Sequence, residues 1–350
     1  MSSHLYNRRK FIQTGALATM GAGLSMNVFG KQLTSLYDTS AAPGTSGYLE
    51  SGRVGIIGLD TSHVVAFAKS LNAPNVRPEL AGFKVVAAFP EGTKDIAYGL
   101  SRKPQFIAEI KGMGIELVDS IDDLLKKVDV VLLESNDGRV HLKQLIPVLK
   151  AGKRVFVDKP ISNSLEGGIE IFKAAKKYNI PVFSSSSLRF APQVQALANG
   201  KLGKVLGADT YSPAHLEKTH PDLFWYGIHG VEILYTLMGA GCKSVTRTSV
   251  ADTEVVVGTW ADNRVGVFRG LRSGKPNYGG TAFCENGIES IAPYAGYEDL
   301  LIEIVKYFRT GEVPVKPEVT LEMLAFMEAA DVSKKNGGVP TDLQMINVKL

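Results

Sequence analysis

The first half of the chain alternates short continuous apolar runs with stretches whose apolar residues recur at a helical period. Continuous runs of this kind predict strands that are buried on both faces. We expect such strands at 54–57, 83–89, 115–118, 128–134, 154–157 and 181–183. We expect helices between them at 64–71, 121–127, 141–150 and 165–177. Strands that alternate with helices predict a doubly wound parallel sheet over residues 52–186.

The pattern changes in the second half, where strands follow one another with little helix between them. These strands are expected at 205–211, 244–249, 254–260, 264–271 and 281–285. One helix, at 223–238, interrupts them, and helices at 297–309 and 321–335 follow, the last capped by Thr320. The fold class is therefore α/β, with an N-terminal Rossmann doubly wound parallel sheet. A C-terminal α+β domain over 187–350 is expected to hold an open, mostly antiparallel sheet.

The N-terminal segment has the features of an export signal. Arg8 and Arg9 are followed by Phe11 and by a weakly apolar run over 14–28. A twin arginine before a mild apolar run is typical of a twin-arginine signal, so we expect a signal over 1–30, an arm or linker over 31–51, and a periplasmic protein. A chance arginine pair is the alternative, and without a clear small-residue cleavage site, removal of the segment stays open.

Composition narrows the class of partner. Hydrophobic residues make up 45% and charged residues 21% of the 350 residues, as in an ordinary soluble enzyme. The net charge is +4 and no basic tract follows the N-terminus, so we expect no nucleic-acid partner. Beyond the first thirty residues no apolar run approaches the roughly 20 residues that span a bilayer, so no membrane contact beyond export is expected. Cys242 and Cys284 are expected to be buried and unpaired.

The first strand ends in the turn RVGIIGLDTSH, which leads into the first helix. A strand, a glycine turn and a helix N-terminus form the opening of a dinucleotide-binding unit, where backbone N–H groups hold a pyrophosphate. Only Gly58 of the fingerprint G-x-G-x-x-G is present, since Asp60 and His63 stand at the other two glycines. Thr61 or Ser62 is expected to cap the helix. If the loop binds a dinucleotide, the Asp60 carboxylate must turn away from the phosphates or be neutralised by a partner such as His63.

The order of parts resembles the glucose–fructose oxidoreductase / inositol dehydrogenase (Gfo/Idh/MocA) family over nearly the whole chain after residue 50. The segments that carry the resemblance are VGIIGLD, SNDGRVH at 135–141, AGKRVFVDKP at 151–160 and FWYGIHGVEILYTLMG at 224–239. The family couples NAD or NADP to oxidation or reduction of a sugar or polyol hydroxyl. The resemblance implies that Lys159 and His229 meet at the substrate.

The chain also departs from the family pattern. Asp60 and His63 replace two glycines, and Pro90 stands where an acidic residue would bind the adenosine ribose, with Glu91 directly after it. Trp225 occupies the place of the family's catalytic Asp. Three departures weaken dinucleotide binding and the fourth removes a member of the acid–base set.

Candidate residues follow from the motifs and the resemblance together. Catalytic candidates are Lys159, His229 and Glu232. Cofactor-binding candidates are Gly58, Asp60, Thr61, Ser62, His63, Glu91, Ser135, Asn136, His141 and Asp158. Substrate candidates are Arg189, Trp225, Tyr226 and His220. Helical spacing puts Tyr226, His229 and Glu232 on one face, so a carboxylate is expected to orient the imidazole or to share a metal with it.

Two functions from different classes remain open, together with a plain binding role. The first is a NAD(P)-dependent oxidoreductase acting on a sugar, a glycoside or a keto-sugar, for which no metal ligand is assigned. The second keeps the fold but uses Asp60, His63, His229 and Glu232 in a metal-assisted or acid–base elimination or hydration of a keto-sugar. The third is a sugar-binding relative without catalysis. A homo-oligomer is expected because an open antiparallel sheet invites pairing of copies.

Overall fold

The computed structural model describes residues 47–294 and 296–343. All of them belong to one packed unit. The predicted export signal and nearly all of the predicted arm lie outside the described residues. Within the described ranges, no helix is both long and apolar enough to cross a bilayer.

The first sheet consists of parallel strands. They are β1 (Gly52–Ile57), β2 (Phe83–Phe89), β3 (Glu116–Leu117), β4 (Val130–Leu133), β5 (Arg154–Val157) and β6 (Val182–Phe183). Their order in the sheet is β3-β2-β1-β4-β5-β6, and the paired strands run parallel. Strand order reverses between β1 and β4, so a crevice opens at the carboxyl ends of these two strands. The predicted doubly wound parallel sheet is confirmed.

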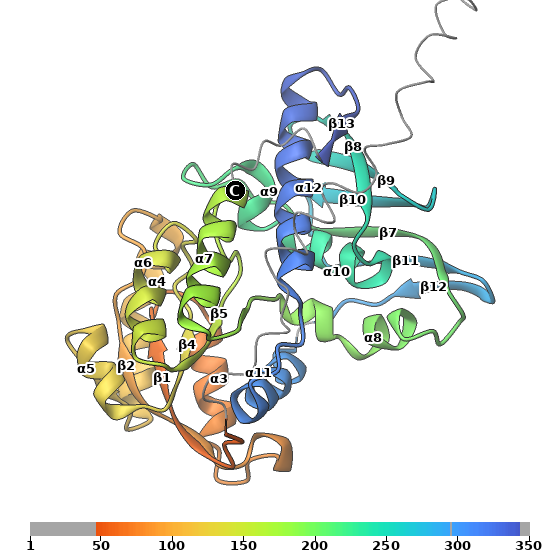
Figure 1. The fold of residues 1–350 in the computed structure, drawn as a ribbon. Coiled ribbons are helices and arrows are strands. Elements are labelled where there is room, and N and C mark those ends of the chain that lie inside the picture. The colour runs from red at the N-terminus through yellow and green to blue at the C-terminus, as the bar shows by residue number, and fades with distance from the viewer. Residues whose placement is uncertain (1–46, 295, 344–350) are drawn as a thin grey trace, which may run out of the picture. The chain divides into compact units, whose positions relative to one another are not determined.

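Helices cover this sheet on its faces (Figure 1). They are α3 (His63–Leu71), α4 (Ala97–Gly112), α5 (Ile121–Lys127), α6 (His141–Lys150) and α7 (Leu165–Tyr178), with a short 3₁₀ turn η1 (Pro78–Leu80). The sequence pattern did not predict α4, because it contains Pro104 and buries only Gly99, Phe106 and Ile110. Its apolar period is therefore too weak to stand out.

The second sheet is mostly antiparallel. Its strands are β7 (Val205–Pro213), β8 (Cys242–Ser249), β9 (Thr253–Trp260), β10 (Val265–Leu271), β11 (Gly279–Cys284), β12 (Gly287–Ile291) and β13 (Thr341–Asp342). They lie in the order β12-β11-β7-β10-β9-β8-β13, and β10 with β7 forms its parallel pair. The predicted α+β second part is confirmed, and β12 and β13 are added to it. Cys242 and Cys284 are buried and unpaired, as expected.

Helices in the second half of the chain pack on the second sheet, and one of them packs on the first sheet instead. They are η2 (Ser187–Phe190), α8 (Pro192–Ala198), α9 (Asp222–Trp225), α10 (Ile228–Met238), α11 (Glu298–Thr310) and α12 (Pro317–Lys335). Figure 1 shows α10 and α12 against the second sheet, which they contact through β7, β8 and β10. In contrast, α11 packs its apolar face, including Leu300 and Ile304, into the core of the first sheet.

Two helix predictions in the second half are wrong in detail. The expected single helix at 223–238 breaks at Tyr226, whose φ of −122° leaves the helical region, and α10 starts after Gly227. The last helix begins with Pro317, which is favoured in a first turn, so Thr320 lies inside it instead of capping it.

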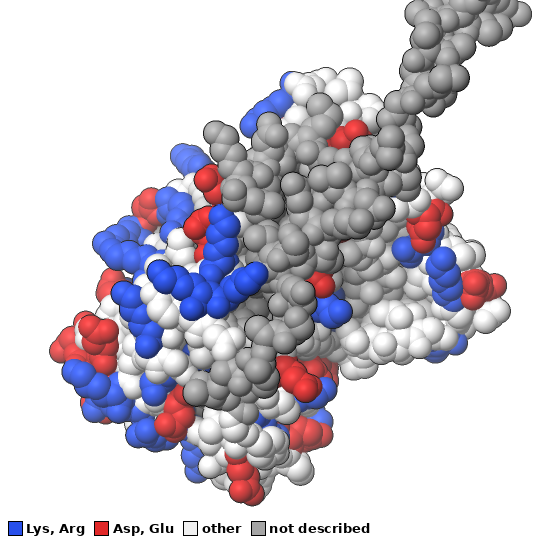
Figure 2. Space-filling model, viewed as in Figure 1, with Lys and Arg blue, Asp and Glu red and all other residues white. Residues whose placement is uncertain are grey.

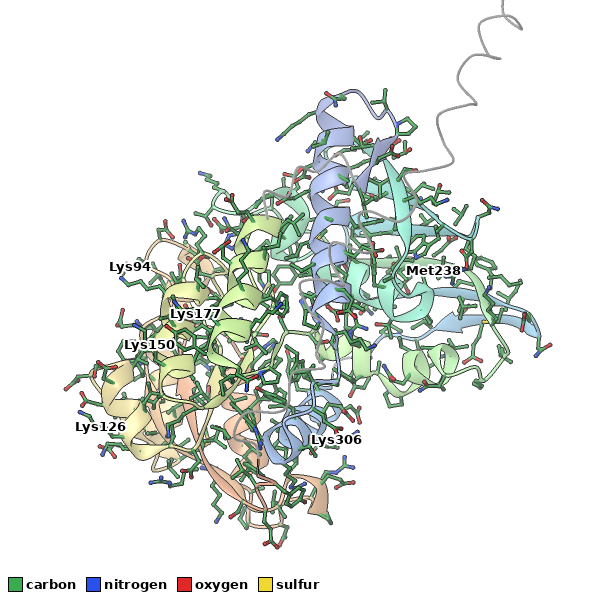
Figure 3. The ribbon with its side chains drawn as sticks, in the orientation of Figure 1. Lys94, Lys126, Lys150, Lys177, Met238 and Lys306 are labelled. Carbon is green, nitrogen blue, oxygen red and sulfur yellow. The ribbon has the colours of Figure 1, made fainter. Side chains whose placement is uncertain are left out.

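Charged side chains on the visible face are mixed in sign over the helices of the first sheet (Figure 2). Lys126, Lys150 and Lys177 are exposed on the outer side of α5, α6 and α7 (Figure 3). These basic residues therefore lie on the helical layer and not at the carboxyl edge of the strands, where the candidate site is found.

Candidate active site

A cavity of about 170 Å³ opens where the carboxyl edge of the first sheet faces the break between α9 and α10. Both halves of the chain contribute to its wall. The lining residues are Asp60, Thr61, Ser62, His63, Tyr98, Arg102, Asn136, Asp158, Lys159, Ser187, Leu188, Trp225, Tyr226, His229, Tyr278, Tyr294 and Tyr297. The cavity thus lies at the topological switch point of the sheet, where open α/β folds bind ligands.

The turn after β1 requires glycine at its first position. Gly58 has a φ of +86°, and a Cβ there would lie 2.4 Å from Ser135 Oγ and 2.6 Å from Ser135 N. Both the backbone conformation and the close approach of the β4 loop therefore exclude a larger residue.

Asp60 is turned into the protein. Its carboxylate accepts hydrogen bonds from Thr93 N at 2.6 Å and from Asn136 N at 3.0 Å, and its own carbonyl accepts one from Asn136 Nδ2 at 3.0 Å. Burial raises the pKa of Asp60, and the two backbone N–H groups oppose that rise. The carboxylate ties the β1 turn to the loops after β2 and β4, and His63 is not its partner.

Hydroxyl and guanidinium groups line the cavity above this turn. Thr61 and Ser62 lie in the wall, and Ser62, at the N-cap position of α3, makes no side-chain cap hydrogen bond to the described backbone. The predicted capping role is therefore not seen, and the Ser62 hydroxyl is available to a ligand in the cavity. From α4, Tyr98 and Arg102 line the same wall, and Arg102 Nη1 donates to the Tyr98 hydroxyl at 2.5 Å.

Lys159 and His229 line this cavity together. Lys159 follows β5, and its Nζ lies 5.4 Å from the centre of the Tyr226 ring. Burial lowers the pKa of Lys159, while the Asp158 charge opposes the fall. A desolvated ammonium with a lowered pKa is suited to giving and taking a proton.

His229 is oriented by a serine and not by the carboxylate expected from helical spacing. Its Nδ1 lies 2.7 Å from Ser186 Oγ, which leaves Nε2 for a ligand. Burial, with the charges of Lys159 and His63, holds the pKa of His229 well below its ordinary value, so the ring is neutral near pH 7. Glu232 instead accepts hydrogen bonds from Arg189 Nε and from Ser185 Oγ.

The Arg189–Glu232 pair is buried, and neither residue lines the cavity as far as the described residues define it. The expected place of Arg189 at the substrate and the expected contact of Glu232 with His229 are therefore not seen. The pair ties η2 to α10 and holds the serine segment that carries Ser186. The Arg189–Glu232 pair therefore helps to position His229 through Ser186 and does not itself line the cavity.

Three ionisable side chains meet below the cavity. His63 Nδ1 lies 2.8 Å from Asp158 Oδ2 and 3.7 Å from Glu134 Oε2. They come from the start of α3, the residue after β4 and the residue after β5, so the strand order of the sheet brings them together. Glu134 is fully buried, and neither of its carboxylate oxygens has a hydrogen-bond partner among the described residues.

Burial and neighbouring charges shift the pKa of each member of this group, which we call the acidic trio (His63, Glu134 and Asp158). Burial alone would lower the pKa of His63, but Asp158 and Glu134 raise it to about 10. Burial and the nearby Asp158 charge raise the pKa of Glu134 to about 8. Burial also opposes ionisation of Asp158, yet His63 and Lys159 hold its pKa below the ordinary value. These shifts favour the charged forms of His63 and Asp158, which form an ion pair, and disfavour ionisation of Glu134.

The remaining predicted residues divide into lining and supporting positions. Asn136, Trp225 and Tyr226 line the cavity, where aromatic faces suit the apolar face of a sugar ring. Ser135 is buried and donates to Gln144 Oε1 at 2.7 Å. His141 is also buried.

His141 has a structural position. Its two ring nitrogens lie 3.0 Å from the Ile161 carbonyl oxygen and 2.6 Å from the Ser135 carbonyl oxygen. The ring therefore clamps the loop after β4 to the loop after β5, and it is not part of the cavity wall in the described structure. The cofactor contact expected of His141 is therefore not seen in the described structure.

Glu91 and His220 lie outside the wall that the described residues form. Glu91 is exposed, and its carboxylate pairs with Lys103 Nζ at 3.1 Å. His220 is buried, with Nδ1 2.9 Å from Thr219 Oγ1 and Nε2 3.7 Å from Asp137 Oδ1. Burial lowers the pKa of His220.

Sequence reasoning missed several members of the site. Glu134 ends the apolar run VDVVLLE, and its place at the carboxyl end of a central strand was the signal that could have marked it. Ser186 stands in a run of serines that gives no sign of which one meets His229. The missed lining aromatics are Tyr98, Tyr278, Tyr294 and Tyr297.

The residues at the β1 turn fit a dinucleotide. Among the departures that weaken dinucleotide binding, the Asp60 carboxylate would repel the phosphates, but it is held by backbone N–H groups and is only 1% exposed. Thr61, Ser62 and Arg102 line the wall above the turn with groups that can donate to phosphate oxygens. The sequence required the Asp60 carboxylate to turn away from the phosphates if the loop binds a dinucleotide, and the structure meets this requirement.

Comparison with known proteins agrees with this geometry. Residues 53–186 match the model of the GFO_IDH_MocA family, described as an oxidoreductase family with an NAD-binding Rossmann fold. The chain is 28% identical over 109 residues to a 1,5-anhydro-D-fructose reductase of Ensifer adhaerens, covering 29% of this chain and 33% of the relative. It is 27% identical over 140 residues to the uncharacterized oxidoreductase YhhX of Escherichia coli K12, covering 36% and 40%. The matches thus span about a third to two fifths of these relatives.

Solved structures share the fold over most of both chains. A probable dehydrogenase from Thermotoga maritima has a TM-score of 0.70 at 20% identity, covering 84% of this chain and all of the other. The scyllo-inositol dehydrogenase of Lactobacillus casei with bound NAD(H) and scyllo-inositol has a TM-score of 0.65 at 16% identity, covering 84% and 100%. Residues 53–186 therefore match the NAD-binding Rossmann model of this oxidoreductase family, and the described chain shares the two-sheet fold of the solved structures.

Proposed function

We propose that the protein is a NAD(P)-dependent oxidoreductase that acts on a hydroxyl or carbonyl group of a carbohydrate. One observation carries the proposal: Lys159 and His229 share a cavity with Thr61 and Ser62 of the β1 turn. Groups suited to a phosphate and groups suited to a reacting oxygen therefore face the same space. The named activities of the reductase relative and of the inositol dehydrogenase support a carbohydrate substrate.

In this proposal, different residues bind the phosphates and transfer the proton. Thr61, Ser62 and Arg102 would hold the phosphates, and the chemistry supplied by a bound nicotinamide is hydride transfer to or from the carbon that bears the reacting oxygen. Lys159, with its lowered pKa, takes the proton of a substrate hydroxyl or returns it to a carbonyl oxygen. His229 offers Nε2 to the same substrate.

Aromatic side chains exclude water and orient the sugar. Trp225, Tyr226 and Tyr278 line the cavity beside the two polar groups, and the ring of Tyr278 lies 5.5 Å from that of His229 at a steep angle. Stacking on the apolar face of a sugar ring would present its hydroxyl edge to Lys159 and His229.

Two measurements on the purified full chain test the proposal. Nucleotide released on denaturation is identified by mass spectrometry, and reduction of added NAD or NADP is followed with a panel of polyols, aldoses and glycosides. We expect nicotinamide dinucleotide to bind and at least one carbohydrate to be oxidised. A protein that neither carries nor binds a nicotinamide dinucleotide would refute the proposal.

A non-redox elimination or hydration of a keto-sugar is the second candidate. The acidic trio favours it, because a buried carboxyl group with no hydrogen-bond partner in the described structure, beside the His63–Asp158 pair, exceeds what hydroxyl oxidation requires. Formation of an unsaturated or hydrated product without any change in nicotinamide absorbance would distinguish this reaction from the first.

Export and self-association complete the proposal. The twin arginine in the N-terminal segment supports delivery to the periplasm, after the folded chain has bound its dinucleotide in the cytoplasm. On the second sheet, Phe283 of β11 and Ile288 of β12 pair across the strands and are 36% and 68% exposed. Paired apolar side chains on an open sheet support a homo-oligomer formed through this face.

A further inference from the structure

We propose that His63, Glu134 and Asp158 form a site for one first-row divalent metal ion at the floor of the cavity. The three side chains each offer a ligand atom, and these atoms all lie within 4.8 Å of one another. The proposal does not depend on the proposed function, because it concerns binding of the ion and not the reaction that follows.

The unsatisfied carboxylate of Glu134 is the observation that points to a ligand. A buried carboxylate normally accepts hydrogen bonds, and leaving it without any is costly. Glu134 is 0% exposed, neither oxygen has a hydrogen-bond partner in the described structure, and Oε2 lies 3.7 Å from His63 Nδ1. One of the unpaired oxygens, Oε2, therefore lies near the His63 nitrogen that Asp158 also contacts.

The two separations that involve His63 are close to those of a metal site, and all three ligand atoms lie within 4.8 Å of one another. Ligand atoms about 2.0–2.2 Å from a tetrahedral ion lie about 3.3–3.6 Å from one another. The separation of 3.7 Å between His63 Nδ1 and Glu134 Oε2 is already near this range, whereas the 2.8 Å between His63 Nδ1 and Asp158 Oδ2 must widen by roughly half an ångström.

Charge also favours a cation at this point. A divalent ion displaces the protons of His63 and Glu134, and the two carboxylates and neutral imidazole that remain carry two negative charges, which the ion cancels. The neighbouring ammonium of Lys159 opposes the ion, but it lies in the cavity wall and points toward the Tyr226 ring.

The ion would be open to the cavity on one side. His63 and Asp158 line the cavity, whereas Glu134 lies behind them. Three protein ligands with a free position are the arrangement of metal sites that bind a water or a substrate oxygen. One imidazole and two carboxylates suit Zn²⁺ or Mn²⁺ better than a soft ion.

Calorimetric titration of the metal-free full chain with Zn²⁺ and with Mn²⁺ tests the proposal. We expect saturable binding of one ion per chain for at least one of these metals, and a loss of more than about 100-fold in affinity in Glu134→Gln. Glu91→Gln is the matched control, because this glutamate also follows a strand of the first sheet but is exposed, and it should bind the metal as the native protein does. Absence of saturable binding by the native protein, or native affinity in Glu134→Gln, would overturn the site.

A second measurement needs no variant and so does not depend on whether Glu134→Gln folds. A crystal soaked with Zn²⁺ should show an anomalous-scattering peak between the three side chains. A peak elsewhere, or none at a saturating concentration, would overturn the proposal even if a dinucleotide is bound and carbohydrate is oxidised.

Discussion

Replacing Asp60 by glycine would restore the second glycine of the dinucleotide fingerprint, yet the structure predicts damage and no gain in affinity. The carboxylate accepts hydrogen bonds from Thr93 N and Asn136 N, and it is almost fully buried. Leaving a buried donor without its acceptor costs about 1–3 kcal/mol, so two of them cost about 2–6 kcal/mol. This is a large share of a typical stability of about 5–15 kcal/mol.

Urea unfolding followed by circular dichroism measures this loss, and titration with NADH and NADPH measures affinity in the same preparations. Asp60→Gly should lose about 2–6 kcal/mol of unfolding free energy without binding either nucleotide more tightly. Asp60→Asn should lose about half as much, because its amide keeps one acceptor and turns an N–H donor toward the other donor. As a control, Asp252→Gly changes an exposed turn and should stay within about 0.5 kcal/mol of the native protein.

The reasoning about the turn fails if Asp60→Gly is as stable as the native protein and binds NADH more tightly. That result would mean that the carboxylate faces the phosphates, where it repels them. Equal stability with unchanged affinity would mean that the two backbone N–H groups find other partners at no cost.

Three further predictions concern turnover, pH and export. Lys159→Ala and His229→Ala should each lower kcat about 10²–10⁴-fold, whereas titration with NADH should show unchanged binding. A variant with native kcat would exclude its residue from proton transfer. Burial and nearby positive charge hold the pKa of His229 well below its ordinary 6.5, so this ring stays neutral as pH falls. In the direction of carbonyl reduction, where Lys159 must be protonated to return its proton, kcat/KM should therefore keep its plateau below pH 6.5, and an acid-side midpoint at or above 6.5 would contradict this. Lysine in place of both Arg8 and Arg9 should leave the protein in the cytoplasm on cell fractionation, and unchanged periplasmic delivery would refute the signal.

The fold could be predicted from the sequence where one physical signal dominates. The apolar runs of β1, β4 and β5 are continuous because helices cover both faces of the sheet, and α5 and α6 have the predicted limits. Local pattern failed at α4, where few positions are buried, and at Tyr226, where the chain leaves the helix to place aromatic side chains at the cavity.

The site was only partly predictable, because its key contacts join residues far apart in sequence. Lys159 and His229 stand in recognisable motifs, and the structure brings both to one cavity. The contact between His63 and Glu134 depends on β4 lying next to β1, which the sequence order alone does not state. Helical spacing favoured Glu232 as the partner of His229, but it ignored η2, whose serine segment lies closer to the ring.

A crystal structure of the full chain with NADH tests the central claim most directly. The account predicts electron density for a dinucleotide along Thr61 and Ser62, with its nicotinamide in the cavity that Lys159 and His229 line. A cavity without nucleotide at a saturating concentration of NADH and of NADPH, or a nucleotide bound away from the β1 turn, would contradict it.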